Sequence, residues 1–516
     1  MRSSAKSGVF FLSLSVAIIS LVCAIGFGQS AADFRTPNPP AAPRINGPKV
    51  YGARPGHPFL YRIPCTGTRP IHFAARGLPA SLQLDANSGI ISGQTPADTG
   101  EFPLTLEASN ARGKTSRPFK IVVGTTLGLT PQMGWNDWYS YYEHPTDKDV
   151  REAADAMIAS GMADYGYQFV DIDDAWARRP GSTDAQIGEP TRDRNGNILP
   201  NGRFPSMSEL TSYIHSLGLK AGSYSGPGPL TCARFEASYQ HEEADARQFS
   251  NWGFDLLKYD WCSYGRIAKN KDLSELQLPY RKMGSILQQQ DRDIILNMCQ
   301  YGNGEVWKWG REVGGMSWRT TGDLGAVKGT TLPGFYSVGF ANAALDAHAG
   351  PGGWNDPDYI LIGTVGDATN ITKPAQSTSL TPAEQYSYMS MWSLMAAPLF
   401  FSGEMTRLDP FTLNVLCNPE VIDIDQDILG KQGKIVRKTD KDFILAKPLE
   451  DGSVAVGLFN LSTEPLTIAL DFADAGTGGK RKVHDVWRQK DMGVFKDHFK
   501  YEVKAHDVLL VRLSHP

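Results

Sequence analysis

The sequence has few of the residues that build metal or nucleic-acid sites. Its 516 residues include 6 cysteines and 10 histidines, but no Cys-x-x-Cys motif and no histidine pair at zinc-ligand spacing. Lysine and arginine total 51 against 55 acidic residues, a formal charge of -4, so the chain lacks the positive excess that nucleic-acid binding needs. We therefore expect no metal, no cofactor and no nucleic-acid partner.

Nucleotide and calcium loops are also missing. The glycine-rich segment GSYSGPGPL lacks GxGxxG spacing, and Pro227 and Pro229 would break the helix that binds phosphate. The acidic run from Asp171 to Asp174 lacks the glycine and glutamate of an EF-hand, since Trp176 and Ser182 stand in their places.

A long apolar run occurs at the N-terminus. Arg2 and Lys6 precede apolar residues from Val9 to Phe27, and no charge follows until Asp33. This pattern predicts a signal peptide over 1–32 and a secreted or periplasmic protein, with an uncleaved anchor as the alternative because the run is long. We expect no stable membrane span once the leader is removed. Five cysteines then remain, so at least one is unpaired.

The rest of the chain divides by its periodicity. Residues 44–124 alternate as short strands and predict a β-sandwich that resembles immunoglobulin or cadherin-like modules, with spacing or attachment as its expected role. Over 128–426, helical patterns alternate with about eight strand patterns, which predicts a (β/α)₈ barrel. A doubly wound sheet is the alternative for this region. Residues 427–516 predict an antiparallel β-sandwich domain.

Two aspartates each close a short apolar or aromatic segment. Asp260 ends FDLLKYD, and Asp323 ends WRTTGD. Lys258 and Asp260 are two residues apart and so share one face of the predicted strand. The carboxyl ends of barrel strands form the active face, so these residues predict a polar site on a rigid scaffold. A structural Lys–Asp ion pair is the alternative.

Other polar residues follow the same strand ends: Asp171, Asp173, Asp174, Tyr224, Gln300 and Arg319. Paired carboxylates in such surroundings suit glycoside hydrolysis, in which one carboxylate attacks the anomeric carbon and the other protonates the leaving oxygen. Lys258 would lower the pKa of Asp260 and keep it ionised. Asp323 could have a raised pKa and donate the proton, although Arg319 could either bind sugar or lower that pKa.

A family resemblance covers about three quarters of the chain. MGWNDW, GYQFVDIDDAW, GLKAGSYSGPGPLTCA, WGFDLLKYDWC, WRTTGD and GPGGWNDPD occur in order from Gly128 onward. Together they resemble the successive motifs of the α-galactosidases and α-N-acetylgalactosaminidases of glycoside hydrolase family 27.

The resemblance implies that Asp260 is the nucleophile and Asp323 the general acid/base of a retaining double displacement, with carboxyls about 5 Å apart. It implies ligands for the sugar hydroxyls: Asp173 and Asp174 at O4 and O6, Lys258 near O3 and O4, and Arg319 near O2 and O3. Trp138, Tyr224, Cys232, Gln300 and Asp358 would complete the pocket. It also pairs Cys232 with Cys262, the pair that their positions after strand ends favour.

We therefore expect an exported exo-α-galactosidase that releases terminal α-linked galactose. An α-N-acetylgalactosaminidase, a β-L-arabinopyranosidase and a non-catalytic sugar-binding protein are the alternatives. The chain departs from the family at Cys299-Gln300-Tyr301, where many members have Cys-Glu-Trp, so this position keeps polarity but loses charge. Cys299 is expected to be a buried free thiol. Tyr301, Asn303 and Gly304 are expected near the C2 substituent and would discriminate between the sugars.

Overall fold

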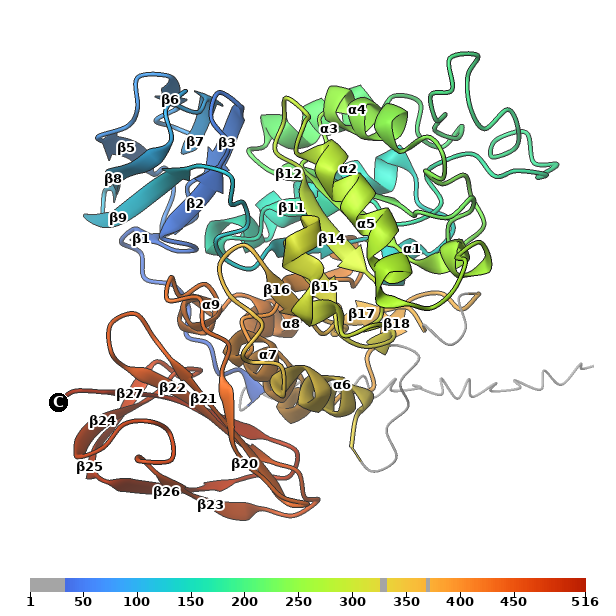
Figure 1. Ribbon diagram of the computed structural model, residues 1–516. Helices are drawn as coiled ribbons and strands as arrows, with labels where there is room; N and C mark the ends of the chain where they lie inside the picture. Colours follow the sequence, from blue (N-terminus) through green and yellow to red (C-terminus); the bar gives the residue numbers. More distant parts are fainter. Residues whose placement is uncertain (1–32, 325–331, 368–371) are drawn as a thin grey trace, which may run out of the picture.

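The computed structural model describes residues 33–324, 332–367 and 372–516. The predicted signal peptide lies outside these residues. Figure 1 shows three bodies: a small N-terminal β module in blue, a central barrel in cyan to orange, and a C-terminal β domain in red. Within the described ranges, no helix is long and apolar enough to cross a membrane.

The central body is the predicted (β/α)₈ barrel. Its eight strands are all parallel to their neighbours and are ordered β16-β15-β14-β13-β12-β11-β10-β19. Ile360, just beyond β16, pairs with Phe401 of β19 and closes the ring. The strands are β10 (Met133–Asn136), β11 (Phe169–Asp171), β12 (Lys220–Ser225), β13 (Leu256–Asp260), β14 (Ile295–Cys299), β15 (Ser317–Arg319), β16 (Trp354–Asp356) and β19 (Leu399–Phe401).

Helices surround the strands, and their local sequences explain their limits. Thr146 and Asp149 form a capping box at the start of α2, because each side chain accepts a backbone N–H of the other residue. Gly253 ends α4 with a positive φ of 94°, a conformation that glycine adopts without strain. The longer helices are α2 (Asp147–Ala159), α3 (Met207–Ser216), α4 (Glu242–Trp252), α5 (Leu273–Leu287), α6 (Gly334–Ala343) and α7 (Pro382–Leu394).

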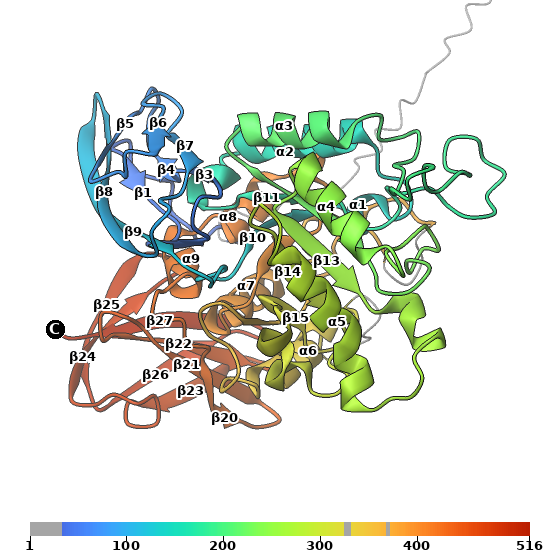
Figure 2. The ribbon, with the colours of Figure 1, turned by 45° about the horizontal axis from the view of Figure 1, so that its top comes forward.

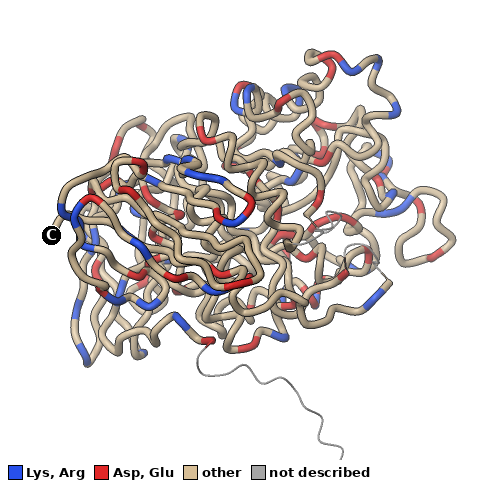
Figure 3. Tube along the Cα trace, turned by 90° about the horizontal axis from the view of Figure 1, so that it is seen from below, with Lys and Arg blue, Asp and Glu red and all other residues tan. Residues whose placement is uncertain are grey.

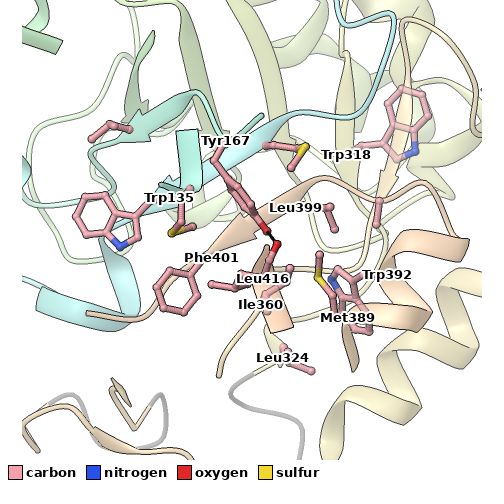
Figure 4. Packing of buried hydrophobic residues seen from close by; sticks show 14 of the residues in the cluster. Trp135, Tyr167, Trp318, Leu324, Ile360, Met389, Trp392, Leu399, Phe401 and Leu416 are labelled. Atoms are coloured by element: carbon pink, nitrogen blue, oxygen red, sulfur yellow. Dashed lines mark hydrogen bonds between the residues drawn. The ribbon is translucent and has the colours of Figure 1, made fainter. Parts of the chain in front are cut away.

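The barrel core is rich in buried aromatic residues. Trp135, Trp318 and Trp392 are fully buried, and Figure 4 shows them around the strands near Leu399 and Phe401. Buried polar tips have partners: the indole N–H of Trp135 donates to the Gly403 carbonyl at 2.8 Å, and the Tyr167 hydroxyl donates to the Leu416 carbonyl at 3.1 Å. This packing makes the strand ends a rigid platform.

The N-terminal module has two main sheets. One has the order β2-β9-β8-β5 and the other β3-β7-β6, with a separate β1-β4 pair. Phe59, Tyr61 and Phe119 lie in a core that is separate from the barrel core. The strands are β1 (Arg44–Ile45), β2 (Val50–Ala53), β3 (Pro58–Arg62), β4 (Cys65–Thr66), β5 (His72–Arg76), β6 (Leu82–Leu84), β7 (Ile90–Gln94), β8 (Gly100–Asn110) and β9 (Gly113–Val123).

This module is docked on the barrel through arginines. Arg54 Nε lies 2.7 Å from Asp293 Oδ1, just before β14, and Arg69 Nη2 lies 2.6 Å from Asp164 Oδ1. The ammonium of Lys220, the first residue of β12, lies 5.1 Å from the ring centroid of Tyr51. The module therefore covers the amino ends of the barrel strands, the face opposite the catalytic end.

The C-terminal domain is antiparallel, as predicted. A six-stranded sheet, β20-β21-β22-β27-β24-β25, faces the β23-β26 pair across an apolar core. Figure 2 shows this domain beside α7 and below the module, and Figure 3 shows acidic and basic residues interspersed along the chain. The strands are β20 (Lys434–Lys438), β21 (Asp442–Pro448), β22 (Val454–Asn460), β23 (Leu466–Asp471), β24 (Lys480–Asp485), β25 (Lys490–Lys496), β26 (His498–Val503) and β27 (Val508–Ser514).

Candidate active site

A pocket lies at the carboxyl ends of the barrel strands. It includes every residue predicted from the sequence for catalysis or sugar binding, except Gln300, Asn303 and Gly304. Its lining is Trp138, Tyr139, Asp173, Asp174, Tyr224, Cys232, Lys258, Asp260, Tyr301, Arg319, Asp323, Asp358 and Tyr359.

Asp260 is the last residue of β13 and is 4% exposed. Its Oδ2 accepts a hydrogen bond from the Tyr224 hydroxyl at 3.1 Å, and its Oδ1 accepts one from the Tyr301 hydroxyl at 2.6 Å. Burial raises the pKa of Asp260 above its ordinary value, while Lys258 and the Tyr301 hydrogen bond act in the opposite direction. The expected lowering by Lys258 is thus present, but desolvation outweighs it.

Lys258 makes its ion pair with Asp173. Its Nζ lies 2.7 Å from Asp173 Oδ2, and the same oxygen accepts hydrogen bonds from Asn136 at 2.9 Å and from the Tyr359 hydroxyl at 3.0 Å. The Lys258 side chain is 11% exposed and that of Asp173 only 3%. Lys258 therefore does form a buried ion pair with an aspartate. Its partner is Asp173, which follows β11, and not Asp260 of its own strand.

Asp174 faces the same pocket with an unusual proton affinity. Its two oxygens accept the backbone N–H groups of Ala175 at 2.6 Å and of Ala233 at 2.8 Å. Burial raises the pKa of Asp174 to about 7, even though these hydrogen bonds lower it. A carboxyl in this state can accept or donate a hydrogen bond with a ligand hydroxyl near neutral pH.

The opposite wall carries Arg319, Asp323 and Asp358. Arg319 Nη2 lies 2.9 Å from Asp358 Oδ2 and 3.3 Å from Asp323 Oδ1. Burial raises the pKa of Asp358 to about 6, with the Arg319 guanidinium acting against the rise. The Asp323 side chain is 50% exposed, whereas that of Asp358 is 1% exposed. Asp323 is thus the carboxyl on the open side of the pocket, where a leaving group would depart.

The structure contains the expected disulfide between Cys232 and Cys262. Of the other cysteines in the described ranges, Cys65, Cys299 and Cys417 are buried free thiols, as expected for Cys299. Cys262 follows Asp260 after one residue, so the disulfide ties the end of β13 to the loop after β12.

Gln300 does not line the pocket. Its side chain is completely buried, and neither amide atom has a hydrogen-bond partner among the residues that the structure describes. Asn297 and Cys299 of β14 pair in register with Lys258 and Asp260, so by strand alternation residue 300 turns to the other face. Tyr301 reaches the pocket instead because its backbone has a positive φ of 60°.

Three buried residues of the site were not predicted from the sequence. Tyr139 and Tyr359 line the pocket, and Asp137 accepts the backbone N–H of Asp173 at 2.8 Å. Asp137 and Tyr359 stand within or directly after the motifs MGWNDW and GPGGWNDPD, so their position was the available signal. Asp356 accepts the backbone N–H of Asp358 at 2.8 Å and does not line the pocket.

Asp260 and Asp323 face one polar pocket at the carboxyl ends of the strands of a (β/α)₈ barrel. A pair of carboxylates in such a pocket is the arrangement that the class of glycoside hydrolases uses.

Comparison with known proteins identifies the family. The family model described as Alpha galactosidase A matches residues 130–427, and the model for the Alpha galactosidase C-terminal beta sandwich domain matches 443–513. An Ig-domain model matches residues 42–124. The chain belongs to the alpha galactosidase A family.

Individual relatives agree with this assignment. The chain is 36% identical over 386 residues to an alpha-galactosidase of Cyamopsis tetragonoloba, a match that covers 74% of this chain and 85% of the relative. The crystal structure of alpha-galactosidase I from Mortierella vinacea is 26% identical, with a TM-score of 0.67, over 76% of this chain and 98% of that one. A structure from Bacteroides fragilis is 33% identical, with a TM-score of 0.83, over 92% and 98% of the two chains.

Proposed function

We propose that the protein is an exported, retaining α-galactosidase that releases terminal α-linked galactose from oligosaccharides or polysaccharides. The observation that carries the proposal is the placement of Asp260 and Asp323 in one pocket together with Asp173 and Asp174. The relatives from Cyamopsis tetragonoloba and Mortierella vinacea, which match along most of their length, are alpha-galactosidases, and this supports galactose as the sugar. The predicted leader supports export.

In the proposed mechanism Asp260 attacks the anomeric carbon. The bond from that carbon to the leaving oxygen breaks, and Asp323 donates its proton to that oxygen. Asp323 then removes a proton from water, whose oxygen attacks the same carbon and releases the Asp260 carboxylate. The exposure of Asp323 and the burial of Asp260 suit these roles, because the leaving group and the water must enter at Asp323.

The ion pairs position the hydroxyl-binding groups before sugar arrives. The Lys258–Asp173 pair presents a cation and an anion to neighbouring hydroxyls, and Arg319 is held by Asp358 on the other side. We assign O4 and O6 to Asp173 and Asp174, O3 and O4 to Lys258, and O2 and O3 to Arg319. Preorganised polar groups of this kind lose little free energy when they bind.

Hydrolysis of aryl glycosides tests the proposal. Purified protein should cleave an aryl α-galactoside and release α-galactose first, as seen by proton NMR. Asp260→Asn should lower kcat by at least about 10³-fold, whereas Asp98→Asn, an exposed position in the N-terminal module, should not change it. Cleavage of an α-N-acetylgalactosaminide or a β-L-arabinopyranoside without cleavage of the galactoside would reject galactose, and release of β-galactose would reject retention.

A further inference from the structure

We propose that Tyr301 is a positioning residue that fixes the orientation of the Asp260 carboxylate and keeps it ready for attack. This inference rests on the proposed function, in which Asp260 is the nucleophile. Tyr301 is one of the residues at which the chain departs from the pattern of its family.

The contacts of the carboxylate carry the inference. Tyr301 donates to Oδ1 at 2.6 Å, and Tyr224 donates to Oδ2 at 3.1 Å. In the described ranges, these two phenols are the hydrogen-bond donors to the Asp260 side chain. One donor on each oxygen sets the rotation of the carboxylate plane, which a single donor would leave freer. The shorter of the two bonds comes from Tyr301.

Tyr301 is itself held in place by its loop. Its φ is 60° and that of Gly302 is 82°, both in the left-handed region. The Gly302 N–H donates to the Arg319 carbonyl at 3.0 Å, and a Cβ on residue 302 would lie 2.3 Å from the Thr320 carbonyl oxygen. The loop is therefore pressed directly against the end of β15. A non-glycine residue held with a positive φ beside a reacting group suggests that its side chain must occupy a defined position there.

The disulfide supports both phenols. The Tyr301 hydroxyl lies 3.7 Å from Cys232 Sγ, and the Tyr224 hydroxyl lies 3.3 Å from Cys262 Sγ. Each sulfur of one covalent link thus contacts one of the two tyrosines that bind Asp260. If either tyrosine moved away from the other, its contact with the disulfide would be lost. The disulfide therefore helps to hold both hydroxyls in place around the Asp260 carboxylate.

The hydrogen bond from Tyr301 also opposes the effect of burial on Asp260. It lowers the pKa of Asp260, whereas desolvation raises it. Without the phenol, the pKa of Asp260 should move further up, and a larger share of the carboxyl would be protonated and unable to attack. If Tyr301 acted only in packing, Tyr301→Phe would keep the ring in place and leave the pKa of Asp260 unchanged.

The test compares Tyr301→Phe with wild type and with a matched control, Tyr501→Phe, which changes a 39% exposed tyrosine of the C-terminal domain. For Tyr301→Phe we expect kcat on an aryl α-galactoside to fall about 10- to 100-fold, with little change in KM. The acidic limb of the kcat/KM profile should move to higher pH, and the melting temperature should stay within about 2 °C. An unmoved acidic limb, or a loss of activity that parallels a loss of melting temperature, would overturn the inference.

A covalent label separates this inference from the proposed function. An α-galactosyl fluoride that carries a second fluorine on the ring should esterify the nucleophile: a carboxylate oxygen bonds to C1 and fluoride leaves. Mass spectrometry should find the sugar on Asp260 in wild type, and labelling should be slower in Tyr301→Phe. Absence of label from Asp260 would reject the proposed function, whereas labelling of Asp260 at equal rates in both proteins would reject the role of Tyr301 alone.

Discussion

Replacing Lys258 by methionine should reveal how strongly the active site depends on its buried ion pair. The substitution keeps a chain of similar length but removes the ammonium that lies 2.7 Å from Asp173 Oδ2. Asp173 would keep two neutral donors, Asn136 and Tyr359, but no cation at this oxygen. A carboxylate that is 3% exposed would then be buried without a partner charge.

The expected cost follows from burial. Breaking a buried pair by removing one partner destabilises by about 3–5 kcal/mol, because the remaining charge stays desolvated. The module and the barrel together have roughly 400 residues, and at about 2 cal/mol/K per residue their unfolding entropy is about 0.8 kcal/mol per kelvin, so the melting temperature should fall by about 4–6 °C. The double variant Lys258→Met/Asp173→Asn removes both charges and should recover most of this loss.

Differential scanning calorimetry at neutral pH provides the measurement. Lys148→Met is the matched control, because the Lys148 side chain is 79% exposed and its ion pair with Glu152 lies on the surface of α2. This control should shift the melting temperature by less than about 1 °C. A single variant Lys258→Met that melts within about 1 °C of wild type, or a double variant no more stable than the single one, would refute the reasoning.

Two further predictions concern stability. The pKa of Asp174 is raised to about 7 and that of Asp358 to about 6, so the unfolded chain loses these two protons at a lower pH than the folded protein does. The free energy of unfolding should therefore fall as the pH rises from about 4 to 7, by up to about 4 kcal/mol from Asp174. Urea titrations should show that this free energy depends less on pH in Asp174→Asn, and an equal pH dependence in variant and wild type would contradict the raised pKa of Asp174. Arg54→Ala, which breaks the module's ion pair with Asp293 at 2.7 Å, should cost about 2 kcal/mol in the same assay. Arg112→Ala, which changes an exposed arginine of the module, should leave the free energy of unfolding unchanged. Equal losses of stability in Arg54→Ala and Arg112→Ala would contradict the docking of the module on the barrel.

The barrel was predictable because its signals are local. Alternating strand and helix periods recur along the chain, and the Thr146 capping box is visible in four residues. The strand ends likewise predicted most of the pocket, since parallel strands bring their carboxyl ends together. Asp260 and Asp323 were found in this way, each as an isolated carboxylate after an apolar or aromatic segment.

What escaped prediction depends on distances between elements. Lys258 is two residues from Asp260 in sequence, but its short contact is with Asp173 on another strand. Gln300 leaves the pocket and Tyr301 enters it as expected, because the backbone takes a left-handed turn at 301 that strand alternation does not reveal. The raised pKa of Asp260 depends on burial by the whole pocket, which no single neighbour determines.

The docked N-terminal module has a consequence for how the molecule unfolds. Asp255, at the start of the segment that carries the nucleophile, lies 2.8 Å from His215 and 2.6 Å from Arg292, and it interacts electrostatically with Lys220 beneath the Tyr51 ring of the module. Loss of the module would uncover this charged layer to water, so module and barrel should lose their structure together. A calorimetric trace should show a single cooperative transition for the two. The module is then a structural part of the barrel domain that keeps the amino ends of its strands away from water.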